Sequence, residues 1–266
     1  MTSAVLTAQT TPVSLAFTAR LYFKETKYEF LKLMRMKAFS LSTIGFPVMF
    51  YLLFGVSNGH AAPGTFNFAK YLLASYSCFG LIGASLFGIG VGLANERAHG
   101  WLEVKQASPM PPMAYLLAKL LTAIGFSLII STLLITMGLT LAGVHISALE
   151  IVRLLGITVA GAIPFATMGL FLALIVPANA APGIVNLIYL PMSFASGLWM
   201  PIEALPHWLR SIAPMLPTYH FAQLALNVVG YARPGSMLLH WEALAGFTFL
   251  LLGFCWLAFS RLAARA

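Results

Sequence analysis

Long apolar stretches alternate with short polar ones along most of this chain. The apolar runs cover approximately residues 39–58, 69–94, 115–144, 149–176, 183–200 and 243–260. A helix needs about 20 apolar residues to cross a hydrocarbon core roughly 30 Å thick, and each run is close to this length or above it. The pattern therefore predicts an all-α integral membrane protein with six transmembrane helices.

Residues 14–37 precede the first run and have a different character. Six Lys and Arg residues alternate there with large apolar side chains, which predicts a cytoplasmic interfacial helix lying at the membrane surface. A solvated basic helix that only fixes orientation is the alternative. Residues 1–13 are uncharged and aperiodic, so we expect a mobile tail there. Residues 14–266 are expected to form a single transmembrane domain.

Two polar or mixed segments interrupt the apolar pattern. Residues 95–112 hold Glu96, Arg97, Glu103 and Lys105 in a chain that is only 8% charged, which favours a docking role for this loop. Residues 200–241 alternate apolar stretches with prolines and isolated polar side chains. This second pattern predicts two short re-entrant or interfacial helices, broken at Pro214 and Pro217, before the last span.

The second apolar run also carries a stripe of small residues. Gly80, Ala84, Gly88 and Gly92 recur at every fourth position and share one helix face. Such a face admits a closely packed helix, either from the same chain or from a second copy.

The distribution of basic residues predicts the orientation. With the N-terminus inside, eleven Lys and Arg residues fall in cytoplasmic segments and four fall outside. Cytoplasmic loops normally carry this excess, so we expect both termini in the cytoplasm. The net charge of +8 is then explained by the anionic inner leaflet, and no nucleic-acid partner is needed.

The catalytic motifs of common enzymes are absent from the sequence. There is no aspartate, no H-E-x-x-H, no G-x-S-x-G and no G-x-x-x-x-G-K-[ST], and the six histidines lack metal-ligand spacing. We therefore expect no catalytic residue, no metal site and no cofactor in this chain. An ion-coupled carrier or channel acting without ATP is the alternative function. It is disfavoured because the sequence shows no ionisable residue deep in a span, where such carriers usually keep one.

Two groups of motifs carry a family resemblance. The first reads Glu96-Arg97-Ala98, then residues 100–103 (GWLE), Ser108-Pro109 and Ala118-Lys119-Leu120. The second reads SGLWMP over residues 196–201 and continues through Leu205-Pro206 to the LPTY of residues 216–219. In this order and spacing the chain resembles the ABC-2-type permeases, the membrane subunits of bacterial ATP-driven exporters. Ala98 and Trp101 depart from the acid and the threonine that are usual at those positions.

The resemblance implies a half-size permease of the bacterial cytoplasmic (inner) membrane. Two copies would form the pathway, and separate P-loop ATPase subunits, which bind ATP and Mg²⁺, would dock beneath them. The docking residues implied for the coupling loop 95–112 are Glu96, Arg97, Gly100, Trp101, Leu102, Glu103 and Lys105. The second and fifth spans would line the route, which implicates Phe79, Asn186, Tyr189 and Met192. The resemblance selects no particular cargo.

Overall fold

The computed structural model describes residues 15–59, 65–106 and 111–263, and within these ranges it contains helices and no strand. The long helices are α1 (Leu15–Arg35), α2 (Lys37–Phe50), α3 (Phe68–Ser85), α6 (Pro112–Thr140), α7 (Ala148–Ile175), α8 (Ala181–Ala195) and α11 (Met237–Ala263). The shorter helices are α4 (Gly92–Ala98), α5 (Trp101–Gln106), α9 (His207–Ile212) and α10 (Pro217–Val228). The predicted tail at residues 1–13 lies outside the described residues, as do residues 107–110.

Two of these helices continue through turns of different pitch. A π-helical turn (Tyr51–Gly55) and a 3-10 turn (Val56–Asn58) extend α2, and a second π-helical turn (Leu86–Val91) joins α3 to α4. The last residues of the second span, which the sequence placed in a loop from residue 95, are therefore helical as far as Ala98. Two further 3-10 turns, Ile202–Ala204 and Ala213–Met215, flank α9.

Among the described residues, five helices are long and apolar enough to cross a membrane. They are Lys37–Asn58, Phe68–Ala98, Met113–Thr140, Ala148–Ile175 and Met237–Ala258. The predicted fifth span, 183–200, is shorter: α8 has 15 residues and ends at Ala195. Gly197 follows with φ of 78°, a backbone conformation that favours glycine and stops the helix. The third predicted span, 115–144, extends past the end of α6 at Thr140. The helix that contains the last predicted span, α11, begins at Met237 and not at residue 243.

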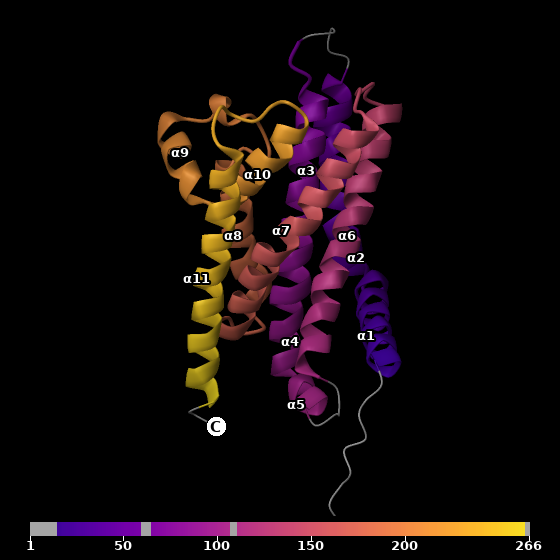
Figure 1. Cartoon of the computed structure of the whole chain (residues 1–266), viewed down its shortest axis with the longest axis vertical. Helices are drawn as coiled ribbons and strands as arrows, with labels where there is room; N and C mark the ends of the chain where they lie inside the picture. Colours follow the sequence, from indigo (N-terminus) through magenta and orange to yellow (C-terminus); the bar gives the residue numbers. More distant parts are fainter. Residues whose placement is uncertain (1–14, 60–64, 107–110, 264–266) are drawn as a thin grey trace, which may run out of the picture.

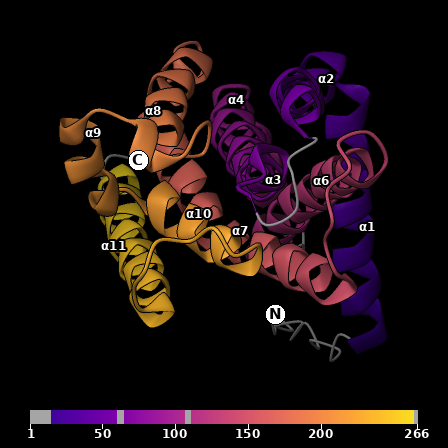
Figure 2. The same cartoon turned by 90° about the horizontal axis from the view of Figure 1, so that it is seen from above.

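The helix formed by α3 and α4 is the centre of the bundle. In its most apolar stretch 83% of the residues are buried, against 17% for the helix that begins with α2 and 22% for α11. It packs against α6, α7, α10 and α2, which surround α3 in Figure 2. The stripe of small residues makes this packing close within one chain: a Cβ on Gly80 would lie 2.7 Å from Ile130 of α6. A helix that is apolar on all sides belongs in such a central position.

The bundle has two distinct ends (Figure 1). The end that carries α5 and the C-terminus of α11 is here called the α5 end, and α9 and α10 mark the opposite, α9 end. Helix α1 lies beside the α5 end. Figures 1 and 2 together show that it runs across the direction of the long helices and not along it. Its position at a membrane surface stays a prediction.

The segment before the last helix is broken into short helices, as its prolines predicted. Pro214 lies in the 3-10 turn that ends α9, and Pro217 occupies the first position of α10. All residues of α10 from Pro217 to Leu226 are buried. The ring of Phe221 packs 5.3 Å from that of Phe165 on α7, which fixes α10 against the bundle.

Candidate functional site

A short helix projects from the α5 end. The backbone of α4 ends at Ala98, and Gly100 then adopts φ of 72°, which turns the chain sharply into α5. A residue with a Cβ would be strained in this conformation. The turn therefore fixes the direction in which α5 leaves the bundle.

A buried ionic cluster joins this segment to two helices. The Nζ atom of Lys119 on α6 lies 2.7 Å from a carboxylate oxygen of Glu29 on α1 and 3.1 Å from one of Glu96 on α4. Lys32 of α1 completes the cluster, with Nζ 2.7 Å from Glu29 and a second ion pair to Glu96. The hydroxyl of Tyr115 donates to Glu96. The four charges cancel, which makes their burial tolerable.

The cluster raises the pKa of Lys32, which stands at its exposed edge. Burial acts against the charged ammonium, but the hydrogen bonds and negative charges of Glu29 and Glu96 outweigh it. The lysine is therefore charged throughout the physiological range.

Lys105 makes a second connection between α5 and α1. Its ammonium pairs with Glu25 at 2.5 Å and lies 4.0 Å from the centre of the Tyr115 ring. Glu25 and Glu29 are one helical turn apart, so both acids of α1 face inward. The outward face of α1 keeps only basic charges.

Arg97 connects the same segment to a third helix. Its guanidinium donates to the carbonyl of Leu174 at 2.5 Å and to that of Val176 at 3.0 Å. Leu174 lies in the last turn of α7 and Val176 directly follows the helix, so neither carbonyl has a helical N–H available to it. Arg97 therefore caps α7 and holds it to the end of α4.

The predicted docking residues consequently divide into two sets. Glu96, Arg97 and Lys105 face the protein and hold the segment in place. Trp101 is 58% exposed and presents apolar surface outward. Val104, which sequence reasoning did not single out, is 62% exposed beside it. Leu102 and Glu103 lie in α5 by their backbone, and their side chains are outside the described part of the structure. Contact of this loop with a partner stays a prediction.

Three of the four predicted pathway residues lie around a groove of about 420 Å³ between α2, α3 and α8. Phe79, Asn186 and Tyr189 line it. The Tyr189 hydroxyl donates to the Phe79 carbonyl at 2.8 Å, and the two rings stack with centroids 4.7 Å apart. Met192 is not among the lining residues; it is buried, and its carbonyl accepts a hydrogen bond from the hydroxyl of Ser196.

Sequence reasoning missed the partners of Lys119 and placed Glu96 in a loop, whereas it belongs to the second helix. Glu96 and Lys119 both lie within helices long enough to cross a membrane, and Lys119 is only 2% exposed. The one available signal was the isolated lysine in a long apolar run, because a buried lysine requires an acid nearby. The aromatic residues of α2 in the groove, Phe39 and Phe46, were also missed.

Comparison with known proteins finds transport permeases among the relatives of this chain. YvfS of Bacillus subtilis strain 168, whose name describes a transport permease, is 27% identical over 211 residues, which cover 79% of this chain and 86% of that protein. Inner membrane transport permease YhhJ of Escherichia coli K12 is 29% identical over 153 residues, covering 53% of this chain and 38% of that protein. The match with YhhJ thus spans less than half of that protein.

The match to a family covers most of the chain. Residues 21–229 correspond to the ABC-2 type transporter family, a stretch that includes most of α1, the ionic cluster, α5, the groove and α10. With several helices of membrane-spanning length, this membrane protein belongs to the ABC-2 type transporter family.

Proposed function

We propose that this chain is the membrane-spanning permease subunit of an ATP-driven exporter. Two copies form the pathway, and separate ATPase subunits supply the free energy by hydrolysing ATP. Membership of the ABC-2 family supports this proposal, as do the transport permease names of two relatives. The chain itself has no phosphate-binding lysine motif, so ATP must be bound by another subunit.

One observation carries the proposal: α5 is exposed at its tip and firmly connected at its base. Trp101 and Val104 offer an apolar contact surface that a monomer gains nothing by exposing to water. An exposed tryptophan on a fixed helix is a typical anchor for a protein partner. We assign this surface, which we call the α5 tip, to the ATPase subunit.

The base of α5 explains how hydrolysis would act on the pathway. Glu96 connects the segment to α1 and α6, and Arg97 connects it to α7. A displacement of α5 by a closing ATPase must therefore either move these helices or break buried ion pairs. Coupling requires that the partner favour one of two helix arrangements, and this connected base supplies the mechanical link.

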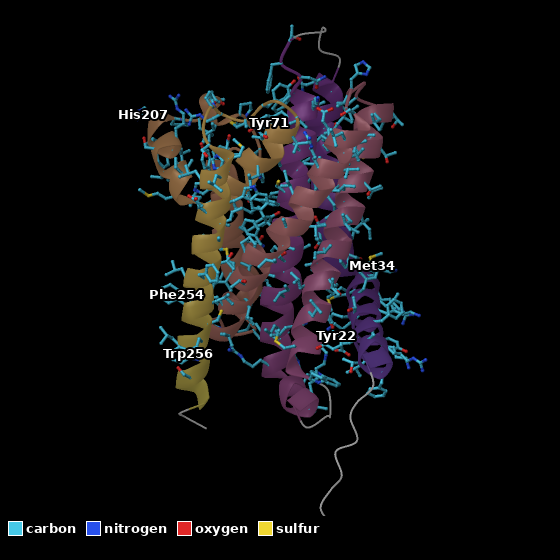
Figure 3. All side chains as sticks on the ribbon, viewed as in Figure 1. Tyr22, Met34, Tyr71, His207, Phe254 and Trp256 are labelled. Atoms are coloured by element: carbon cyan, nitrogen blue, oxygen red, sulfur yellow. The ribbon has the colours of Figure 1, made fainter. Side chains whose placement is uncertain are left out.

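The exposed face of α8 supports a second copy. Asn186 and Leu187 are both exposed on this apolar helix, and Leu187 is 73% exposed. An amide is unfavourable against lipid tails, so intramembrane polar residues usually face a protein interior or a water-filled route. We place this face against the route between two copies, opposite the lipid-facing helix α11, whose Phe254 and Trp256 point away from the bundle in Figure 3.

The outer face of α1 fits the cytoplasmic surface of the membrane. Arg20, Lys24 and Lys27 are exposed there, next to exposed Phe23 and Tyr28. Basic side chains attract anionic lipid, and aromatic rings settle at headgroup depth. We therefore place the α5 end and both termini in the cytoplasm of a bacterial cell, with α1 in the inner leaflet.

The decisive experiment separates docking from coupling. The chain is co-expressed with candidate P-loop ATPase subunits from the same genome, and copurification and ATP-dependent transport are measured. Trp101→Ala should reduce ATPase association at least tenfold, whereas Trp208→Ala, an equally exposed tryptophan at the α9 end, should not change it. Arg97→Met should keep association and lose transport.

Two results would contradict the proposal. Unchanged association and transport of the Trp101→Ala protein would remove the docking role of the α5 tip. Transport by the chain alone, driven by an ion gradient and indifferent to vanadate and to the ATPase, would favour the ion-coupled carrier.

A further inference from the structure

The groove between α2, α3 and α8 has a chemical character of its own. Figure 2 shows α8 and α2 on either side of the helix formed by α3 and α4, and the groove lies between them. Five of its lining residues are aromatic: Phe39, Phe46, Phe79, Phe87 and Tyr189. Stacked and tilted rings of this kind bind flat apolar molecules through dispersion and burial of surface. Its volume, about 420 Å³, lies in the range of small-molecule sites.

Charge is missing from the lining. The residues that line the groove include no Lys, Arg, His or Glu. A phosphate, carboxylate or sulfate moved into such a groove would lose its hydration without gaining a counter-charge, which is strongly unfavourable. The groove therefore discriminates against anionic molecules and against the anionic part of a larger one.

Hydrogen bonding in the groove is limited to a few side chains. The Tyr189 hydroxyl is already engaged by the Phe79 carbonyl. Asn186 makes no side-chain hydrogen bond to another described residue, and it lines the groove together with Ser42 and Thr43 of α2. The Asn186 amide can therefore donate a hydrogen bond to a carbonyl of a bound molecule or accept one from its hydroxyl.

From these observations we propose that the groove binds an uncharged, ring-bearing, mainly apolar compound, and that Asn186 selects it through one hydrogen bond. Describing this compound as transported cargo rests on the proposed function; its binding in the groove does not. Aromatic side chains supply the affinity, and the absence of charge supplies the selectivity.

Photolabelling with a matched pair of probes tests this inference. Benzophenone is uncharged and carries one carbonyl between two rings, and 4-benzoylbenzoate adds a carboxylate to the same frame. Each is irradiated with the full chain in lipid nanodiscs, and labelled peptides are mapped by mass spectrometry. The lipid-facing peptide around Phe249 and Trp256 reports non-specific labelling from the bilayer.

The expected result is saturable labelling by benzophenone in peptides 38–47, 79–87 and 186–190, with linear labelling around Trp256. The carboxylate probe should label the groove at least tenfold less relative to the same reference. Asn186→Leu should raise the half-saturating concentration of benzophenone about fivefold, as the loss of one hydrogen bond implies. Leu238→Ala, at an exposed leucine of α11 that does not line the groove, should leave that concentration unchanged.

Three outcomes would overturn the inference: equal groove labelling by both probes, non-saturable labelling that matches the α11 peptide, or no effect of Asn186→Leu. Each can occur while ATPase docking and ATP-dependent transport remain intact, in which case the proposed function stands without this ligand class. Conversely, selective labelling of a chain that never associates with an ATPase would support the proposed ligand class of the groove and contradict the exporter function.

Discussion

The ammonium of Lys119 lies 2.7 Å from the carboxylate of Glu29, where the two side chains are 1% and 5% exposed. Glu29 belongs to α1, which is not among the helices that are both long and apolar enough to cross a membrane, and Lys119 lies within one of those helices. The pair thus fixes a helix at the edge of the bundle to its interior. Both charges have lost their hydration, so each depends on the other for stabilisation.

Removing one partner of this pair should be strongly destabilising. We expect Lys119→Met to lower the free energy of unfolding by about 3–5 kcal/mol, because Glu29 and Glu96 then share only Lys32. Thermal unfolding of the purified protein in detergent measures the loss. Lys24→Met on the exposed face of α1 is the control and should change stability by less than about 0.5 kcal/mol.

The double variant distinguishes pairing from simple packing. In the double variant Glu29→Gln/Lys119→Met, Lys32 is left to neutralise Glu96 alone. The double variant should therefore lower the free energy of unfolding by less than Lys119→Met does. Additive losses in this double-mutant cycle would show that the two residues do not depend on each other.

Two of the three glycines of α7, Gly156 and Gly161, should respond in opposite ways to the same substitution. A Cβ at Gly161 would lie 2.2 Å from the Phe221 ring of α10, whereas nothing lies within 4 Å of a Cβ at Gly156. Gly161→Ala should therefore destabilise the protein by about 1–3 kcal/mol, as overpacking does. Gly156→Ala should be neutral or slightly stabilising, because alanine favours helix. The melting temperatures of the two variants and the wild type test this prediction. Equal shifts for both variants would refute the close packing of α7 against α10.

Acid should loosen the α9 end through His220. Its ring contacts the Pro214 carbonyl through Nε2 at 2.9 Å and the Nδ1 atom of His240 at 2.8 Å. Burial lowers the pKa of His220 below its ordinary value near 6.5 and outweighs the opposing hydrogen bond to Pro214. Below about pH 6.5 the unfolded chain then binds more protons than the folded one, so stability falls as the pH drops towards the lowered pKa.

A substitution isolates this effect. His220→Gln keeps a donor for the Pro214 carbonyl and removes the titrating ring, so the stability loss between neutral pH and pH 5 should shrink. His207→Gln, at an exposed histidine on the same end, should leave the loss unchanged. A pH profile of thermal unfolding that is identical for wild type and the His220→Gln protein would refute the prediction.

The apolar pattern predicted the helices because a membrane-spanning segment needs length and hydropathy, and both are local properties. Three-dimensional pairing was not accessible in the same way. Glu29 and Lys119 are 90 residues apart, and no local spacing relates them. The inward direction of Glu96 and Arg97 was hidden as well, since a helix that is apolar on all sides gives no indication of its rotation. The end of α8 depended on the backbone of a single glycine, Gly197.

The orientation of the bundle is the last prediction, and the distribution of charge supports it. At the α9 end, Lys70 pairs with Glu150 and Arg233 pairs with Glu203. Most of the basic residues lie at the α5 end, on α1 and at Arg97 and Lys105. By the positive-inside rule we expect the α5 end to be cytoplasmic.

Single cysteines test this orientation in a chain whose buried Cys78 and Cys255 are replaced by Ala. In intact cells an impermeant maleimide should label the His207→Cys protein, whose position lies at the α9 end in Figure 3, and should label the Val104→Cys protein only after permeabilisation. Labelling of both variants from outside would reverse or abolish the assignment, and with it the access of a cytoplasmic ATPase to the α5 tip.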